Sequence, residues 1–547
     1  MKVLSTASLL FLLFFGNVLH GSLIDAGRQQ GTFHHITVRI LGPMVNQWEN
    51  SGFRIFRCTN HTRQDIPLKL SLRIDRTPSG TPSFVSTRIT LRSRAVCDIP
   101  LSAPGFPHFT TFTPEVQAPD GVSVELIKIS SPHSRNQIVS SSIRPDFFEF
   151  MLDDYHKIDT PVGKWPLYSE AYAGLSTILL DSKDKLSPEL MKTLQLAAAS
   201  GTNVVVLVMG NTPFPEYAAA GEKKGIFKKE IGFGTWSVIR TRAVPSDPEW
   251  KKFTDRKYEL SRKHGKHHHK YRREKWIEKE LIQLLEQKTP AWGKSFANDV
   301  HILPPAIPLG NLVLLMLGFV LIAGPLNYHL LKRKNLELWG VLTIPAISFI
   351  FCAAVTICVV AGENLYSEGK GKVETRLDQI SGIIASTGGF SIYSPLSRKD
   401  FSFDRKDIIS FLEYGRINGT VIKDKVYFSS SLVPSRMSCL YSVSKAEYTG
   451  KKLEIIEKKD SIELVNSLGT TVNKVCVQNS RGQHFLLSVP LLPGAKAVLQ
   501  KCSQTPPAFR NIGPNSYCAE ITEPFHIAPG LMADKYTHSQ KLYGKWK

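Results

Sequence analysis

The sequence has few cysteines, and their absence from one long stretch excludes a class of enzyme there. The chain holds 8 cysteines in 547 residues, and none lies between Cys97 and Cys352. No two cysteines have C-x-x-C spacing, so neither a zinc ribbon nor a thioredoxin-like redox site is predicted. A Gly-x-Ser-x-Gly motif, expected for a serine nucleophile on a strand-to-helix elbow, is also missing. We therefore predict no catalytic residue, no metal site and no cofactor.

Acidic residues are scarce relative to basic ones. Lys and Arg number 68 against 47 Asp and Glu, for a formal net charge of +21. In a cytosolic protein this charge would suggest nucleic acid as a partner. However, residues 1–22 carry Lys2 and then an uncharged run, Leu9–Phe15, which indicates a signal peptide. Whether it is cleaved stays open. Export excludes nucleic acid and leaves anionic lipid, an acidic envelope polymer or solubility as the reason for the charge.

Long hydrophobic runs are confined to residues 307–331 and 338–361. At ~1.5 Å per helical residue, each run can cross a hydrocarbon layer of ~30 Å. The loop between them, residues 332–337, carries Lys332, Arg333 and Lys334, and short basic loops stay cytoplasmic. The sequence therefore predicts a multi-pass protein of the cell inner (plasma) membrane with both large flanking domains extracytoplasmic.

Short β-type segments dominate both ends of the chain. Within residues 30–132, Leu68, Leu70, Leu72 and Ile74 alternate with polar or basic residues, the period of a half-buried strand. Residues 365–547 continue in β-type segments without a long helical period. We predict an N-terminal β-sandwich and a C-terminal β-sandwich domain, the latter single or double.

Residues 133–300 alternate strand and helix patterns. Thr177–Leu180 and Asn203–Met209 read as buried strands, and the second is a continuous apolar run typical of a parallel strand covered on both faces. Ser187-Pro188-Glu189 begins a helix with a cap residue and a first-turn proline. We predict an α/β domain of Rossmann-like type, so the fold class is multidomain α/β plus β with a two-helix transmembrane hairpin.

Three segments resemble parts of uncharacterised bacterial envelope membrane proteins. Residues 165–210 are similar to their amidotransferase-like α/β domain, 324–348 to their Gly-Pro-Leu-Asn-Tyr membrane hairpin, and 461–499 to their distal immunoglobulin-like module. The sequence departs from the family at residues 197–201, where Ala-Ala-Ala-Ser-Gly replaces the usual Trp-Val-x-x-Gly-Gly ending. The resemblance implies architecture and location without a reaction. An active amidotransferase-like domain would need a nucleophilic cysteine, which this region lacks.

A basic, histidine-rich segment spans residues 251–280, shortly before the first hydrophobic run. We predict that it lies against anionic membrane lipid, where each cation contributes about 1 kcal/mol. The cations proposed for this contact are Lys263, Lys266, Lys270, Arg272 and Arg273. Residues 267–269 are adjacent histidines that could bind a transition metal, but the surrounding cations favour a solvated basic loop.

Each soluble part holds an even number of cysteines, which favours disulfides in an oxidising compartment. Cys58 is predicted to pair with Cys97. The distal candidates pair among themselves in one of three connectivities that the sequence leaves open: Cys439, Cys476, Cys502 and Cys518.

The candidate binding site lies in the α/β domain, at the loops that follow its buried strands. In open parallel sheets, such loops line a crevice at the carboxyl ends of the strands. Asp181 and Asn211 could supply polar contacts there. The simpler interpretation is that Asp181 satisfies turn amides and Asn211 opens a loop.

These features favour a non-enzymatic, membrane-anchored envelope protein whose exported domains bind a protein partner or an envelope polymer. The alternatives are a hydrolase-like enzyme with an unrecognised site in the α/β domain, and an anionic-ligand or metal sensor. A strongly perturbed carboxylate or histidine in a deep pocket would favour the enzyme, whereas a flat exposed apolar patch would favour partner binding.

Overall fold

A computed structural model of the chain describes part of its length. The described residues are 30–33, 36–41, 52–75, 83–104, 111–117, 123–125, 129–130, 136–140, 155–159, 162–172, 175–209, 212–219, 221, 226–241, 299–302, 309–334, 336–362, 367–396, 401–411, 418–428, 437–458, 461–502, 509, 512–521, 523–530 and 533–546. The predicted signal peptide, the basic segment 251–280 with its five cations, and Asn211 lie outside these residues.

Two sheets form the N-terminal part of the molecule. The first has the order β1 (Gln30–Phe33), β2 (Ile36–Leu41), β3 (Gly52–Asn60) and β6 (Val96–Ala103). The second contains β5 (Ser83–Leu91), β4 (Ile66–Asp75), β7 (Thr111–Gln117) and β8 (Ser123–Glu125), while β9 (Ile129–Ser130) also pairs with β7. The alternating residues Leu68, Leu70, Leu72 and Ile74 are buried in the core of this part. The predicted β-sandwich character is therefore confirmed.

Strands from beyond the hydrophobic runs complete the second N-terminal sheet. β18 (Phe401–Asp404), β21 (Lys425–Phe428) and β20 (Asn418–Ile422) extend it, and β20 pairs in parallel with β5. The register joins Asn418 to Phe84 and Val421 to Thr87, and Thr87 Oγ1 donates a hydrogen bond to the Val421 carbonyl at 3.3 Å. Strands β18, β20 and β21, which were predicted to belong to the C-terminal domain, thus lie within the N-terminal sheet.

A mixed sheet follows, in the order β11 (Tyr155–Asp159), β10 (Asn136–Ser140), β12 (Thr177–Asp181), β13 (Asn203–Met209), β15 (Gly234–Thr241) and β14 (Ile226–Ile231). The first five strands are parallel, and β14 is antiparallel. Helix α2 (Pro188–Ala199) is capped by Ser187, whose hydroxyl accepts a hydrogen bond from the Leu190 amide at 3.1 Å. The other described helices here are the short η2 (Val162–Lys164), η3 (Ser169–Tyr172) and α3 (Glu216–Ala219).

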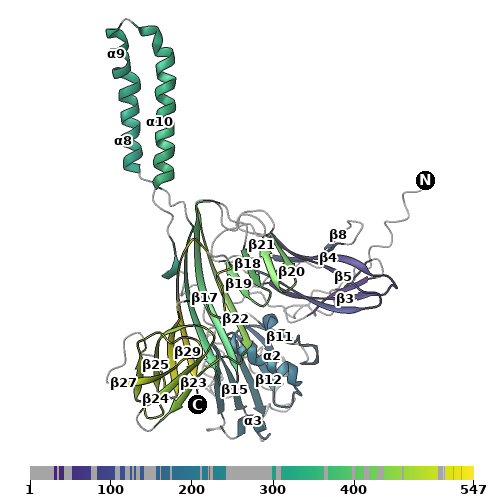
Figure 1. Ribbon diagram of the computed structural model, residues 1–547. Helices are drawn as coiled ribbons and strands as arrows, with labels where there is room; N and C mark the ends of the chain where they lie inside the picture. Colours follow the sequence, from purple (N-terminus) through teal and green to yellow (C-terminus); the bar gives the residue numbers. More distant parts are fainter. Residues whose placement is uncertain are drawn as a thin grey trace, which may run out of the picture.

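The C-terminal part is one long sheet. Its order is β19 (Ile408–Phe411), β22 (Met437–Tyr448), β17 (Ile383–Ser394), β16 (Glu368–Asp378), β29 (Lys535–Lys545), β28 (Ser516–Ile521), β25 (Val472–Gln478), β26 (His484–Leu487), β27 (Lys496–Cys502), β24 (Ile462–Ser467) and β23 (Lys452–Glu457). Helix α2 also contacts this sheet, because the Tyr448 hydroxyl lies 2.8 Å from Gln195 Oε1 and Ile383 joins the core around α2. Figure 1 shows α2 beside β22 and β12.

A helical hairpin projects from this body (Figure 1). Its first arm comprises α8 (Leu309–Leu321), the π-helical turn η4 (Ile322–Leu326) and α9 (Asn327–Arg333); its second is α10 (Gly340–Gly362), preceded by η5 (Glu337–Trp339). The arms are long and apolar enough to cross a membrane. Pro325 lies in the π-helical turn, and the Asn327 side-chain amide donates to Thr343 Oγ1 at 3.0 Å between the arms.

Candidate functional site

Asp181 is the last residue of β12, and its carboxylate and amide form hydrogen bonds within the turn that follows. Its carboxylate accepts a hydrogen bond from the Lys183 amide at 3.0 Å, and its amide donates to Asp184 Oδ2 at 2.8 Å. This reciprocal bonding is the turn-stabilising role that the simpler interpretation assigned to Asp181. The partner proposed for it, Asn211, lies outside the described residues.

Strand β15, separated from β12 by β13, brings a cation to the same edge of the sheet. Arg240, near the end of β15, donates from Nη1 to the Thr212 carbonyl at 2.8 Å and places its guanidinium 4.9 Å from the Phe214 ring centre. The sequence analysis did not select Arg240. One sequence feature could have indicated Arg240 as a site residue, namely its position at the carboxyl end of a strand next to β13, which was predicted correctly.

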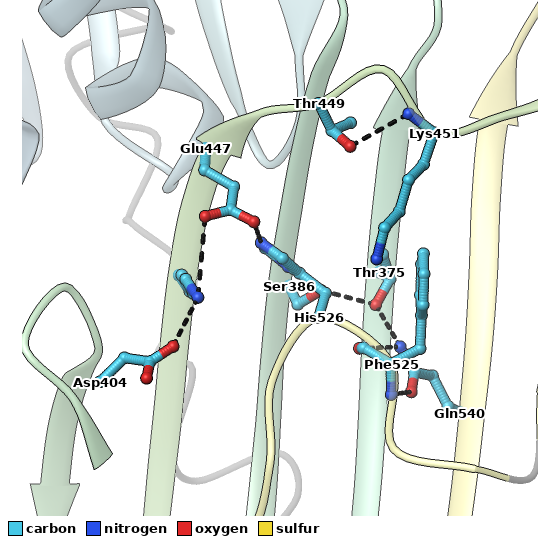
Figure 2. Close-up of polar contacts among 10 residues, drawn as sticks. Thr375, Ser386, Asp404, Glu447, Thr449, Lys451, Phe525, His526 and Gln540 are labelled. Carbon is cyan, nitrogen blue, oxygen red and sulfur yellow. Dashed lines mark hydrogen bonds and ion pairs between the residues drawn. The ribbon is translucent and has the colours of Figure 1, made fainter. Parts of the chain in front are cut away.

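A second cluster of polar groups lies on the long sheet, beneath the segment 523–530 that joins β28 to β29 (Figure 2). The Gln540 side chain forms two hydrogen bonds with the backbone of this segment. The Phe525 amide donates to Gln540 Oε1 at 3.0 Å, and Gln540 Nε2 donates to the Phe525 carbonyl at 2.8 Å. The Lys451 ammonium lies 4.8 Å from the Phe525 ring centre. The segment is thus held by three independent contacts.

The orientation of the Gln540 side chain is fixed by segment 523–530, and a chain of hydrogen bonds begins from it. Because the Phe525 amide can only donate, the amide group of Gln540 has one orientation, and Nε2 also donates to Thr375 Oγ1 at 2.7 Å. Thr375 Oγ1 and Ser386 Oγ share a hydrogen bond of 2.7 Å, and Ser386 Oγ lies 2.7 Å from His526 Nδ1. The other ring nitrogen of His526, Nε2, faces Glu447.

His526 is buried and has an uncommon backbone conformation. Its side chain is 3% exposed, and its φ angle is 72°, a region that few residues other than glycine adopt. Burial lowers the pKa of His526, and the Glu447 carboxylate only partly offsets this effect. His526 Nε2 lies 3.5 Å from Glu447 Oε1, which is long for a hydrogen bond. The contact with His526 is the largest effect lowering the pKa of Glu447 to about 2.

A buried ammonium links this chain of hydrogen bonds to the N-terminal sheet. Lys445 Nζ on β22 lies 2.9 Å from Asp404 Oδ2 on β18 and 3.7 Å from Glu447 (Figure 2). Nearby, Asp407 accepts the Asp404 amide hydrogen bond at Oδ2, whereas its buried Oδ1 has no hydrogen-bond partner among the described residues. Burial raises the pKa of Asp407 to about 7, although Lys445 opposes the shift.

Ser386, His526 and Glu447 have the residue types of a hydrolytic triad, but their burial argues against that chemistry. Ser386 is 1% exposed on the central strand β17, and its hydroxyl is already bonded to both Thr375 and His526. A substrate could reach Ser386 Oγ only if segment 523–530 were displaced. The cluster instead links two sheets and holds a connecting segment in place, so its role is to stabilise the fold.

Two pairs of cysteines lie on directly opposite strand positions, and both pairs are compatible with the predicted pairings. Cys58 on β3 lies opposite Cys97 on β6, and Cys476 on β25 lies opposite Cys518 on β28, without a disulfide among the described cysteines. Burial raises the pKa of Cys58 to about 12 and that of Cys476 to about 11.

Cys439 is remote from the other distal cysteines. It lies on β22 opposite Ile392, and β22 is separated from β28 by three intervening strands. Strands are spaced ~4.8 Å apart, so the separation from Cys518 is far beyond disulfide reach. The prediction that all four distal cysteines pair among themselves is therefore not supported for Cys439, because the order of the strands and not the count of cysteines determines which thiols meet.

Comparison with known proteins does not identify a family or an activity for this chain. No protein-family model and no curated protein matches the chain. A calcium-binding mutant of Bacteroides uniformis β-glucuronidase 2 is 11% identical, with 41% of this chain and 31% of that chain covered and a TM-score of 0.16. A Paenibacillus cycloisomaltooligosaccharide glucanotransferase is 12% identical, with coverage of 41% and 37% and a TM-score of 0.17.

The yeast delta-COP-I mu-homology domain, solved with a Dsl1 WxWxV peptide, is 9% identical, with 33% of this chain and 95% of that chain covered and a TM-score of 0.17. The chain spans about a third of the length of the two bacterial enzymes, 31% and 37%. These scores are too low to carry an inference about activity. The resemblance to bacterial envelope proteins stays a prediction from sequence.

Proposed function

We propose that this chain is a non-enzymatic, membrane-anchored envelope protein whose exported body binds a protein partner or an envelope polymer. The observation that carries the proposal is the pairing of β5, before the hairpin, with β20, after it. Hydrogen-bonded neighbours in one sheet cannot lie on opposite sides of a bilayer. If the hairpin spans the membrane, both flanking regions must therefore share one side of it.

The basic tip of the hairpin supports the orientation. Lys332 and Arg333 end α9, and exposed Lys334 follows directly. Under the positive-inside rule these cations stay cytoplasmic, which leaves the body outside the inner (plasma) membrane and makes the chain multi-pass. Protease added to cells with a permeable outer barrier should then remove both flanking regions. Protection of either region would contradict the proposal.

The proposed binding surface is the edge where β12, β13 and β15 end. The parallel order of these strands supports a Rossmann-like or amidotransferase-like unit, in which ligands bind at the carboxyl ends of strands. Asp181 and Asn211 remain the predicted contacts, and Arg240 adds a cation at the end of β15. The turn after β12 carries both carboxylates and cations, which suits a polar surface of the partner.

The test is crosslinking in intact cells, followed by identification of the attached molecule. The double variant Asp181→Ala, Asn211→Ala should fold and lose most of the crosslinked product. Lys228→Ala is the control, because Lys228 is exposed on β14 opposite Ser237, away from the carboxyl ends of the parallel strands. Equal crosslinking by both variants would move the binding site elsewhere.

The alternative enzyme function is favoured by one observation, the hydrogen-bonded Ser386–His526 pair beside Glu447. Burial of all but 1% of Ser386 weighs against it. The sensor alternative, for an anionic ligand or a metal, depends on the histidine-rich segment outside the described residues. Ser386→Ala should leave the cellular role intact if the chain is not a hydrolase.

A further inference from the structure

One end of the long sheet presents two apolar side chains to solvent. Leu396 is 72% exposed and Met437 is 49% exposed. They lie together, because Ser394 at the end of β17 pairs with Met437 at the start of β22. The buried Ser394 hydroxyl donates to the Leu396 carbonyl at 2.6 Å, which holds the turn that carries Leu396.

The strand register places this pair at the level where the chain enters the hairpin. Helix α10 ends at Gly362 and β16 begins at Glu368. Because an extended chain spans at most ~3.6 Å per residue, Ser367 lies within about 18 Å of Gly362. Glu368 pairs with Tyr393, which pairs with Ser438, so Leu396 and Met437 lie beyond that level on the hairpin side. Figure 1 shows β17 and β22 running from the base of the hairpin into the body.

We propose that Leu396 and Met437 insert into the interface of the bilayer that holds the hairpin, an inference that rests on the proposed membrane anchoring. Burying large apolar side chains in lipid is favourable, whereas leaving both in water next to a membrane is not. Exposed Lys535 lies at the same level, opposite Glu368 on β29, where it can meet anionic head groups.

The consequence is a second membrane contact for the body. With the hairpin as its sole attachment, the body could tilt freely about the root of the hairpin. We call the end of the long sheet that carries Leu396 and Met437 the sheet tip. Its insertion fixes the end of β17 and the start of β22 at the lipid surface. Helix α2, which contacts Tyr448 at the opposite end of β22, is then held on the side of the body away from the membrane.

The test uses the full chain in native membranes with a benzophenone amino acid at one position at a time. Leu396 tests the sheet tip, and Val341 on α10 tests the hairpin. The control is Val498 on β27, which lies far from the hairpin. The side chain of Val341 is 81% exposed and that of Val498 is 60% exposed. Lipid adducts are measured by mass. We expect adducts at Val341 and Leu396 that exceed the Val498 adduct by about tenfold or more, the ratio given by ~1.4 kcal/mol.

The outcomes separate the two proposals. Adducts at Val341 without adducts at Leu396 overturn insertion of the sheet tip and leave the anchoring intact. An absence of adducts at both positions overturns the anchoring and, with it, insertion of the sheet tip. Because all three side chains are exposed, the replacements leave the folded body unchanged.

Discussion

Asp407 is a buried carboxyl group whose charge the fold tolerates poorly. Burial raises its pKa from 3.8 to about 7, so the folded protein holds this proton where the unfolded chain has lost it. The contribution of Asp407 to stability is thus complete below pH 3.8 and is lost as the pH rises through 7.

Replacing Asp407 with asparagine should therefore stabilise the protein at pH 8. The variant keeps an acceptor for the Asp404 amide and removes the buried charge. We expect a gain of about 1–4 kcal/mol in the free energy of unfolding, shrinking toward zero as the pH falls to 4. The measurement is denaturant unfolding at several pH values, with exposed Asp424→Asn as the control. A gain independent of pH would contradict this assignment.

Thr375 transmits the hydrogen bonds that hold segment 523–530. Its hydroxyl accepts a hydrogen bond from Gln540 and shares another with Ser386, and both distances are 2.7 Å. Thr375→Val keeps the side-chain shape but leaves one N–H of the buried Gln540 amide without its acceptor and removes one hydrogen bond of Ser386. We expect a loss of about 1–3 kcal/mol in unfolding free energy. Thr537→Val, at an exposed position of β29, should change little; equal losses in the two variants would show that the network adds no stability.

At the scale of elements, the cross-strand cysteines predict which disulfides form after export. Cys58 faces Cys97 and Cys476 faces Cys518, whereas Cys439 faces Ile392. We expect the first two pairs to oxidise in the exported protein, and a bridge that closes a loop of ~40 residues stabilises by about 3–4 kcal/mol. Mass mapping of the protein from oxidising and reducing preparations gives the answer. A bridge to Cys439, or thiols at all four paired positions, would refute the assignment.

Elements whose signal is local were predictable, and those whose partners are distant in sequence were not. The strands at 177–181 and 203–209 and the capped helix α2 follow from apolar runs and from Ser187-Pro188. The pairing of β5 with β20 joins residues more than three hundred positions apart, so no local pattern reveals it.

The polar cluster was unpredictable for the same reason. Thr375, Ser386, Glu447, His526 and Gln540 come from different strands and one connecting segment, and no motif spacing relates them. In the α/β region burial raises the pKa of Glu170, but His526 and Asp407, whose pKa values are also shifted, lie in segment 523–530 and in the turn between β18 and β19. The burial of His526 and Asp407 follows from the packing of β18 and segment 523–530 on the long sheet.

At the scale of the whole molecule, the chain is divided by its hairpin in sequence but not in space. Strand β20 completes the N-terminal sheet, Lys445 bonds Asp404 across two sheets, and Tyr448 bonds Gln195 of α2. Contacts of this kind are backbone hydrogen bonds and buried polar pairs, which form only when both flanking regions occupy the same aqueous compartment. The central claim is that this single body lies outside the cytoplasm and that the hairpin spans the membrane.

The most direct test is labelling of introduced cysteines by a membrane-impermeant maleimide on cells with a permeable outer barrier. Ser93→Cys reports the region before the hairpin, Thr537→Cys the region after it, and Lys334→Cys the tip of the hairpin, all at exposed positions. Labelling of each variant is compared with labelling of the unsubstituted chain, so that the contribution of the native cysteines is subtracted. The account predicts labelling at positions 93 and 537 in intact cells, and at 334 only after the inner membrane is permeabilised. Labelling of just one flanking region, or of position 334 in intact cells, would contradict it.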